Sequence, residues 1–336
     1  MPDNIFTQAS FVEEIRTAKT AKIIQPVQVG DTQKQNELVF FVKPELLDLQ
    51  DSEKILNSMG LIQEKFKVYD VGISGIAIVP GLVLEEYEIM NRHYGFINQL
   101  SRMASKLVDA QQRASIFDHL DLKDTGAHKV LGGHEFLKTF NADVDSLSKV
   151  WFAQEANKLR SGFYFIEDTF QGQPIILING FHPSQLLHFT REDHRIVLML
   201  LHTDTSWDAM KFNLVGDTFP ERAKPGSIRG MLFADPQKYG QREVGINTNG
   251  VHLSAGPFEA AFEVVNFFGR LIDLDPSKTP PLAIQRVIQA GVDKEKALSL
   301  LKNPGMNESD LFSETENLNT DDAVQRIKEW LDKKPK

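Results

Sequence analysis

Two uninterrupted apolar runs constrain the fold of this chain more than any other feature of its sequence. Residues 38–42 read LVFFV and residues 196–201 read IVLMLL. Short runs of aliphatic, β-branched and aromatic residues are typical of strands buried in a sheet. With 336 residues, of which 41% are apolar, the chain can enclose one large core or two modest ones. We therefore predict a folded protein built around buried strands.

Composition argues against several classes of partner and chemistry. A net charge of -9 and a pI near 5.5 argue against a general binder of nucleic acid or of anionic membranes, although a local basic pocket could still hold a nucleotide. The absence of cysteine excludes disulfides and thiolate chemistry. The N-terminal residues MPDNIFTQASFVEEIR lack the basic and apolar regions of a leader, and no stretch approaches ~20 consecutive apolar residues. We expect a soluble, cytoplasmic protein with no nucleic-acid and no membrane partner.

Residue types suited to phosphate chemistry are concentrated between residues 214 and 263. A Gly-Asp-Thr turn, a Lys-Pro-Gly-Ser-Ile-Arg-Gly loop and an Asn-Gly-Val-His segment follow one another, and the last leads into a helix opened by Pro257. Thr218, Arg229 and His252 thus bring a hydroxyl, a guanidinium and an imidazole close together in sequence. A neutral imidazole can attack phosphorus, and an arginine can fork onto phosphate oxygens. The set favours phosphoryl transfer, in which the protein mainly positions groups and stabilises negative charge.

The same stretch resembles the nucleoside diphosphate kinase family. That family combines a Gly-Glu-Thr-Asn-Pro turn, a Pro-Gly-Thr-Ile-Arg-Gly loop and an Asn-x-x-His-Gly-Ser-Asp segment. Here residues 216–220 read GDTFP, residues 225–230 read PGSIRG and residues 249–255 read NGVHLSA. The order and approximate spacing match as well, which is more specific than any one motif. The resemblance implies an α+β fold with a ferredoxin-like βαββαβ core, in which helices cover one face of an antiparallel sheet.

The resemblance also implies roles for individual residues. Considered alone, Lys43 after the first apolar run is a strand-end surface charge, and Tyr94 is equally well a half-buried core aromatic. By resemblance, Lys43 contacts the nucleotide phosphates and Tyr94 lies near the phosphates and the catalytic His252. Asn249 would position the ribose or a phosphate. Glu263 would hydrogen-bond the imidazole and fix its tautomer, with a solvated helix residue as the alternative.

The chain departs from the family pattern at three positions. The helix before the Gly-Asp-Thr turn carries Phe212 where the family has a phosphate-binding arginine, and the adjacent Lys211 could replace that arginine as a point charge only. Leu253 stands in place of a glycine and Ala255 in place of an aspartate, whereas Ser254 is retained. These departures bear on turnover more than on the fold.

The resemblance divides the chain into four parts. Residues 1–36 would form an N-terminal arm, residues 37–100 and 194–268 the kinase-like core, residues 101–193 an insertion, and residues 269–336 a helical extension. Within the core we expect a helix over 46–59, a strand over 66–79 with a bulge near Gly72 or Gly75, and a last strand over 244–252. The insertion should contain helices over 100–117 and 135–159 and a β-hairpin over 163–181. In the extension, helices are expected over 282–290, 293–301 and 320–331, with a polar loop over 303–319.

Histidines are frequent in and beside the insertion, but their spacing predicts no metal site. No pair has the helical His-Glu-x-x-His spacing or another recognised ligand pattern. We interpret them as solvated or capping residues: His119, His128, His134, His182, His188 and His194.

The leading hypothesis for function is transfer of the terminal phosphate of a nucleoside triphosphate to a nucleoside diphosphate through a phosphohistidine on His252. Lys43, Thr218 and Arg229 would hold the phosphates, with Mg2+ arriving on the nucleotide rather than in a protein cage. By resemblance the protein is a homo-oligomer. The rival hypothesis is a non-catalytic nucleotide-binding module that uses the insertion and the extension to recruit protein partners.

Overall fold

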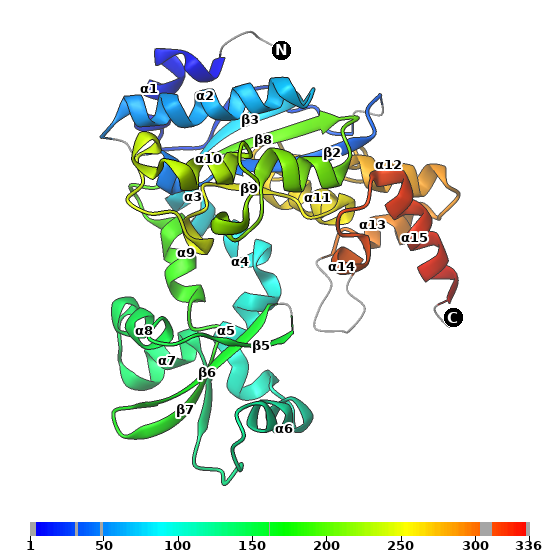
Figure 1. Cartoon of the computed structure of the whole chain (residues 1–336). Coiled ribbons are helices and arrows are strands. Elements are labelled where there is room, and N and C mark those ends of the chain that lie inside the picture. Colours follow the sequence, from blue (N-terminus) through cyan, green and yellow to red (C-terminus); the bar gives the residue numbers. More distant parts are fainter. Residues whose placement is uncertain (1–4, 31–32, 48–49, 161, 303–310, 334–336) are drawn as a thin grey trace. The chain divides into compact units, whose positions relative to one another are not determined.

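The chain folds into two compact units. The computed structural model describes residues 5–30, 33–47, 50–160, 162–302 and 311–333. Unit 1 consists of residues 1–89 and 189–336, and unit 2 of residues 90–188 (Figure 1). Both units mix helices and strands, so the chain is an α+β protein. Each unit has its own sheet.

Unit 1 is built on a five-stranded sheet in the order β1-β3-β8-β2-β9, in which all neighbours are antiparallel. The central pair of strands contains the two apolar runs, which confirms them as buried strands. They align from Asn36 opposite Thr203 to Val42 opposite Val197, and every residue of β2 is buried. The strands of unit 1 are β1 (Lys22–Gln25), β2 (Asn36–Val42), β3 (Gly72–Pro80), β8 (Arg195–Thr203) and β9 (Val251–Leu253).

Both faces of this sheet are covered, which explains why its central strands are apolar at every position rather than at alternate ones. On one face, Leu38, Phe40 and Val42 pack into a core with α1, α2, α10 and the π-helix η3. On the other face, Phe41 packs against Phe267, in the π-helix η7 that continues α11. These elements are α1 (Ala9–Thr17), α2 (Ser52–Val68), η3 (Ala209–Val215), α10 (Ile228–Ala234), α11 (Pro257–Glu263) and η7 (Val264–Phe268).

The N-terminal residues contribute a strand to the sheet as well as a helix. β1 extends the sheet beside β3. The α1 helix is anchored by Arg195, whose Nη1 donates to the carbonyl oxygen of Ile15 at 2.6 Å. Short helical segments complete unit 1: η1 (Ile5–Thr7), η2 (Pro44–Leu46), α3 (Gly81–Glu86), η4 (Pro220–Arg222), η5 (Pro236–Tyr239) and η6 (Ile246–Thr248). The helices α4 (Ile89–His93) and α9 (His182–Thr190) carry the chain from one unit to the other.

Three elements of the core have boundaries other than those expected. The helix expected over 46–59 starts later, because the Asp51 side chain caps it by accepting from the backbone N–H groups of Glu53 and Lys54, and it runs on to Val68. The second strand therefore starts at Gly72, with its predicted bulge between Ile73 and Gly75. The last strand is only β9, since residues 246–248 form a 3-10 turn before it.

The C-terminal extension is helical and packs against α11. Phe258 and Ala261 of α11 share a hydrophobic cluster with apolar residues of the extension. The expected helices over 282–290, 293–301 and 320–331 are confirmed, whereas the expected polar loop contains a further helix; its residues 303–310 lie outside the described residues. The helices are α12 (Leu282–Gln289), α13 (Lys294–Ser299), α14 (Leu311–Thr315) and α15 (Thr320–Lys333).

Unit 2 has a four-stranded mixed sheet in the order β4-β7-β6-β5, with β4 parallel to β7 and the other pairs antiparallel. The predicted hairpin is confirmed as β6 and β7, joined at Gln171-Gly172. Each of the two long helices expected here is broken in two, because Asp109 and Asp143 act as N-caps in mid-run. The second also ends at Trp151, and the last residues of its expected range form the strand β5. The elements are α5 (Gly95–Leu107), α6 (Ala110–His119), β4 (Lys129–Gly132), α7 (Gly133–Phe140), α8 (Val144–Trp151), β5 (Asn157–Arg160), β6 (Phe163–Phe170) and β7 (Gln173–Ile178).

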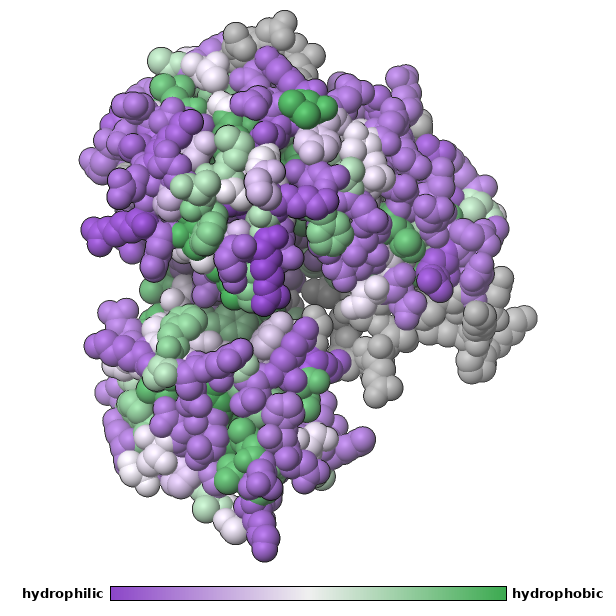
Figure 2. Space-filling view, viewed as in Figure 1, coloured by the Kyte–Doolittle hydropathy of each residue, from purple (hydrophilic) through white to green (hydrophobic). Residues whose placement is uncertain are grey.

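Hydrophilic residues cover most of the face that is seen in the space-filling view (Figure 2). Large apolar side chains that remain exposed are separated in sequence, for example Val68, Phe152 and Phe233. Within the described residues, no helix has both the length and the apolar character needed to cross a membrane.

Candidate active site

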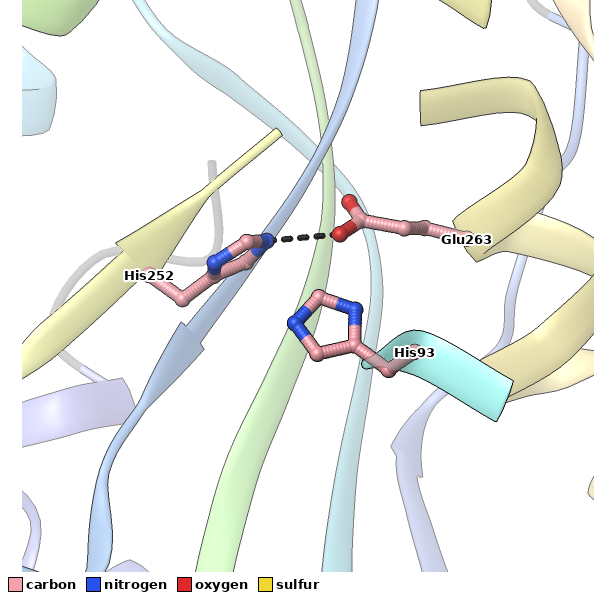
Figure 3. Close-up of side chains that lie close together, drawn as sticks. All are labelled: His93, His252 and Glu263. Carbon is pink, nitrogen blue, oxygen red and sulfur yellow. Dashed lines mark hydrogen bonds and ion pairs between the residues drawn. The ribbon is translucent and has the colours of Figure 1, made fainter. Parts of the chain in front are cut away.

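His252 lies on β9 and is held by a buried carboxylate from the helix that follows. Its Nε2 is 2.7 Å from Oε1 of Glu263 on α11 (Figure 3). Glu263 is fully buried, and its other oxygen accepts a hydrogen bond of 2.5 Å from the hydroxyl of Ser254. Because an ionised carboxylate can only accept, the Nε2 of His252 carries the proton and Nδ1 carries the lone pair. His93, drawn in the same view, belongs to unit 2.

The ring of His252 is also fixed by the neighbouring strand. His252 is aligned with Phe41 on β2, and their rings are stacked with centroids 4.5 Å apart and an interplanar angle of 17°. The His252 side chain keeps 18% of its surface exposed. An imidazole with a set tautomer, held on the outer strand β9 beside β2 and still accessible, is suited to nucleophilic catalysis.

Lys43 is buried at the end of β2 and reaches the segment that precedes His252. Its Nζ donates to Oδ1 of Asn249 at 2.7 Å, and the Asn249 amide donates to the carbonyl oxygen of Thr218 at 3.1 Å. Burial lowers the pKa of Lys43 to about 8, with Glu45 acting in the opposite direction and Arg229 adding to the decrease. The ammonium is still mostly charged at neutral pH, despite the cost of removing it from water.

Arg229 is the second buried cation of this region. Its Nη1 donates to the carbonyl oxygen of Gly216 at 3.0 Å, and its Nη2 donates to that of Val251 at 2.8 Å. Burial lowers its pKa to about 10, while the charges of Asp217 and Glu45 act in the opposite direction. Its Nε has no hydrogen-bond partner in the part of the chain that the structure describes.

The two cations thus converge on the residues that lead into His252. Lys43 and Arg229 are close enough that the charge of Arg229 lowers the pKa of Lys43. Neither forms a salt bridge within the described ranges, and both bond to neutral oxygens. Buried charges are usually paired, because an unpaired charge in a low-dielectric site is costly. This arrangement is therefore suited to hold an anion.

Glycine permits the tight approach of the chain between these cations. Gly250 has a φ of +83°, and a Cβ there would lie 2.4 Å from Leu232 and 2.8 Å from Leu46. Its N–H donates to Oε1 of Glu45 at 2.9 Å, and its carbonyl oxygen accepts from the N–H of Lys43 at 2.9 Å. These contacts keep Asn249 and Lys43 in register with each other.

Lys211 and Phe212, which lie where the family has a phosphate-binding arginine, have different surroundings. The Nζ of Lys211 donates to Oε1 of Glu316 at 2.5 Å and to Oδ1 of Asn317 at 2.7 Å, both in the C-terminal extension. Phe212 is 38% exposed and lines an open polar cleft of about 490 Å³. The other residues around that cleft are Ser206, Asp208, Ala209, Asn213, Asp217, Arg222 and Lys224.

Thr218 and Tyr94 complete the set of predicted site residues. Thr218 is exposed beside Gly216, and its carbonyl oxygen is the group that Asn249 binds. Tyr94 belongs to unit 2 and directly precedes α5; its ring lies edge-on to His93 and His182, with centroid distances of 4.6 and 5.8 Å.

The expectation of solvated or capping histidines is wrong for the buried His182 and the half-buried His134, whose rings bond to other side chains. His182 is fully buried and lies 3.2 Å from side-chain oxygens of both Asn98 and Gln185. The Nδ1 of His134 lies 2.9 Å from the hydroxyl of Ser101. Burial, aided by the charge of Arg102, lowers the pKa of His134 to about 3; burial also lowers that of His182 to about 4. Both rings are therefore neutral at physiological pH.

Sequence reasoning missed Glu259, one turn before Glu263 on α11. Its Oε2 accepts from the N–H of Ala255 at 2.5 Å. Burial, together with the charge of Glu263, raises the pKa of Glu259 to about 8. The spacing of the two glutamates on a helix that starts at Pro257 was the available signal, since residues four apart share one helix face.

Comparisons with known proteins leave the family open. No protein-family model matches the sequence, and no curated protein is significantly similar to it. Among solved structures, the chain is similar to an NDP kinase from Pyrobaculum aerophilum, with 16% sequence identity, coverage of 71% of this chain and 99% of that chain, and a TM-score of 0.34. At this level of similarity the match does not establish membership of a family, so the function has to be inferred from the residues of this chain.

Proposed function

We propose that the protein transfers the terminal phosphate of a nucleoside triphosphate to a nucleoside diphosphate through a phosphohistidine on His252. The observation that carries the proposal is the combination of a tautomer-fixed histidine with two buried cations that lack carboxylate partners among the described residues. The histidine supplies a nucleophile, and the cations supply a site for the anion it attacks.

The topology of unit 1 supports a ferredoxin-like βαββαβ core. Leaving out the N-terminal strand, the sheet order is β3-β8-β2-β9, with α2 between β2 and β3 and with α10 between β8 and β9. An antiparallel sheet in which the first and third strands lie at the centre is the arrangement of that fold. The core would bring the first strand, with Lys43, next to the last strand, with His252.

In the first half-reaction, the lone pair on Nδ1 of His252 would attack the γ-phosphorus. The bond between that phosphorus and the bridging oxygen breaks, and the diphosphate leaves with the electron pair. Glu263 accepts the Nε2 proton in a hydrogen bond throughout, which stabilises the positive charge that develops on the ring. In the second half-reaction, a terminal oxygen of another diphosphate attacks the phosphorus and restores the free imidazole.

Lys43 and Arg229 would hold the phosphates during both steps, because each already lies beside the backbone that leads to His252. Charge-assisted hydrogen bonds to a phosphate would reach the unpartnered Nε of Arg229 and the donors of Lys43. Asn249 bonds Lys43 and is placed to position the sugar or a phosphate. Magnesium would arrive on the phosphate oxygens of the nucleotide and neutralise part of their charge.

The experiment that tests the proposal is mass spectrometry of the intact protein after a brief incubation with ATP and Mg2+ at neutral to basic pH. We expect a phosphoryl adduct that acid removes and base does not, and that GDP discharges as GTP appears. His252→Ala should carry no adduct. His202→Asn is the matched control, since His202 also lies on a strand of unit 1 but outside this site.

Each other outcome has a defined meaning. An adduct of equal size on His252→Ala would exclude His252 as the nucleophile. An adduct that no diphosphate discharges would indicate a different acceptor. Tight ATP binding without any adduct would favour a non-catalytic nucleotide-binding module over an enzyme.

A further inference from the structure

The junction between β9 and α11 decides whether Glu263 can reach His252. Residues 254–256 connect the strand that carries the histidine to the helix that carries the glutamate. From inside, the junction is held by Ser254, whose hydroxyl bonds Glu263 and accepts from the N–H of Val39 at 2.9 Å. A displacement of this junction would separate the carboxylate from the ring.

From outside, the junction is held by the C-terminal extension. The N–H of Asn317 donates to the carbonyl oxygen of Ala255 at 2.9 Å. The carbonyl oxygen of Thr315 lies so close to Gly256 that a Cβ there would approach it to 2.5 Å. Residues about 60 positions after the junction in sequence therefore fix its backbone.

A second path joins the same two segments through Trp207. The indole N–H of this fully buried residue donates to the carbonyl oxygen of Ser254 at 2.9 Å. Its backbone N–H donates to Oδ1 of Asn319, also at 2.9 Å. Asn36 at the start of β2 donates to the same Asn319 oxygen at 3.2 Å and so ties the extension to the central sheet.

An ion pair adds to these bonds. Lys211, which lies in η3 four residues after Trp207, binds Glu316 and Asn317 of the extension. The charges of Lys211 and Glu316 also reach Glu259, which bonds the N–H of Ala255. The extension thus contacts the junction through its backbone and acts on it through charge.

We propose that residues 315–319, which we name the C-terminal turn, are positioning residues for His252: they hold the junction so that Glu263 keeps the ring in its Nε2-protonated form. This inference deepens the proposed function and rests on it for its catalytic meaning. The C-terminal turn acts on the histidine indirectly, through its contacts with residues 254–256 and through the charge of Glu316 at Glu259.

Asn317 offers a matched pair of variants, because its φ is +64°. Asn317→Pro removes the N–H that bonds Ala255 and cannot adopt a positive φ, whereas Asn317→Gly keeps both. The readout is the 15N resonances of the His252 ring in the full-length protein without nucleotide. In the wild type and in Asn317→Gly we expect one protonated nitrogen and one with a lone pair. In Asn317→Pro the two resonances should move toward the average of the two tautomers.

Kinetics give a second readout. A displaced junction should slow formation of the phosphoryl adduct by roughly 10- to 100-fold in Asn317→Pro. ATP affinity should stay at the wild-type value, since Lys43 and Arg229 are not bonded to the junction. Loss of affinity and rate together would indicate a general structural defect and would overturn a specific positioning role.

Asn319→Ala keeps the inference open to refutation should Asn317→Pro not fold, because it leaves the backbone intact and removes only the side-chain oxygen that accepts from Trp207 and Asn36. Unchanged ring resonances in both folded variants would overturn the inference. The readout needs no catalysis, so the two proposals can fail separately. Altered resonances with no phosphoryl transfer in the wild type would leave the positioning role standing and remove the enzyme.

Discussion

The two units bury ionisable groups in opposite ways. Unit 1 keeps the charged groups Lys43, Arg229 and Glu263 inside, held mainly by neutral oxygens, a hydroxyl and an imidazole. Unit 2 contains the buried His182 and the half-buried His134, which lose their charge and bond to neutral side chains. A buried ionisable group costs less free energy when it is neutral than when it keeps its charge. The buried charge that unit 1 retains is the basis of the anion site proposed above.

Acid is the strongest test of this difference, because a fall in pH should destabilise unit 2 and should not destabilise unit 1. In unit 2 the folded pKa values of about 3 and 4 lie below the ordinary value of 6.5, so the unfolded state binds more protons between these limits. The two histidines therefore do not reduce the stability of unit 2 above pH 6.5, and they destabilise it increasingly as pH falls toward 4, by at most about 1.4 kcal/mol per unit of pKa shift and by less for the partly exposed His134.

Hydrogen exchange measured separately for each unit tests this expectation. Amides of β6 and β7 should exchange faster at pH 5 than at pH 7.5 after correction for intrinsic rates, while those of β2 and β8 should not. His182→Gln should reduce the difference. Equal acid sensitivity of both sheets would contradict the contrast between the units.

Removing one buried cation should weaken ligand binding without weakening the fold. Lys43→Met keeps the packed stem and removes the ammonium. We expect ATP affinity to fall by roughly 10- to 100-fold, because hydrogen bonds to charged groups contribute about 1.5–3 kcal/mol. The free energy of unfolding in urea should stay level or rise, since a desolvated charge is gone.

The matched control for Lys43→Met is Lys65→Met, at a half-buried α2 lysine of unit 1 that pairs with Glu64. It removes a charge of the same kind without touching the site, so ATP affinity should be unchanged. If Lys43→Met destabilised the fold and left affinity intact, Lys43 would be a structural cation and the contrast with unit 2 would disappear.

The sequence predicts the parts of this contrast that depend on local pattern. The apolar runs at 38–42 and 196–201 identify the central strands, and the turn and loop motifs bring forward Arg229 and His252. It does not predict that Asn317 meets Ala255, because that contact joins segments far apart in the chain. The burial of His182 depends in the same way on the packing of helices in unit 2, and a single histidine has no periodicity to reveal it. The last strand was predicted too long, over 244–252, since residues 246–248 form a 3-10 turn and Gly250 takes a left-handed conformation just before β9.

Glu259 should give unit 1 a pH dependence of the opposite sign to that of unit 2. Its folded pKa of about 8 lies above the ordinary value of 4.5, so the folded state binds more protons between these limits. Its stabilisation is complete below pH 4.5 and is lost as pH rises through 8. Glu259→Gln should remove this slope. Urea unfolding of wild type and variant at pH 5.5 and 8.5 measures it, and parallel curves would refute the assignment.

Two buried serines provide the finest test of the difference between the units. Ser254 in unit 1 and Ser101 in unit 2 are both fully buried, and each hydroxyl bonds a titratable partner. The partner is an ionised carboxylate for Ser254 and a neutral imidazole for Ser101. Hydrogen bonds to charged groups contribute about 1.5–3 kcal/mol and neutral ones about 0.5–1.5 kcal/mol.

Ser254→Ala should therefore lower the free energy of unfolding by ~1 kcal/mol more than Ser101→Ala. Unfolding of the two variants in urea, followed by probes in each unit, measures both values. If Ser101→Ala lowered the free energy of unfolding as much as Ser254→Ala does, the charge of Glu263 would not strengthen its hydrogen bond. That result would contradict the distinction between a charged site in unit 1 and neutral buried groups in unit 2.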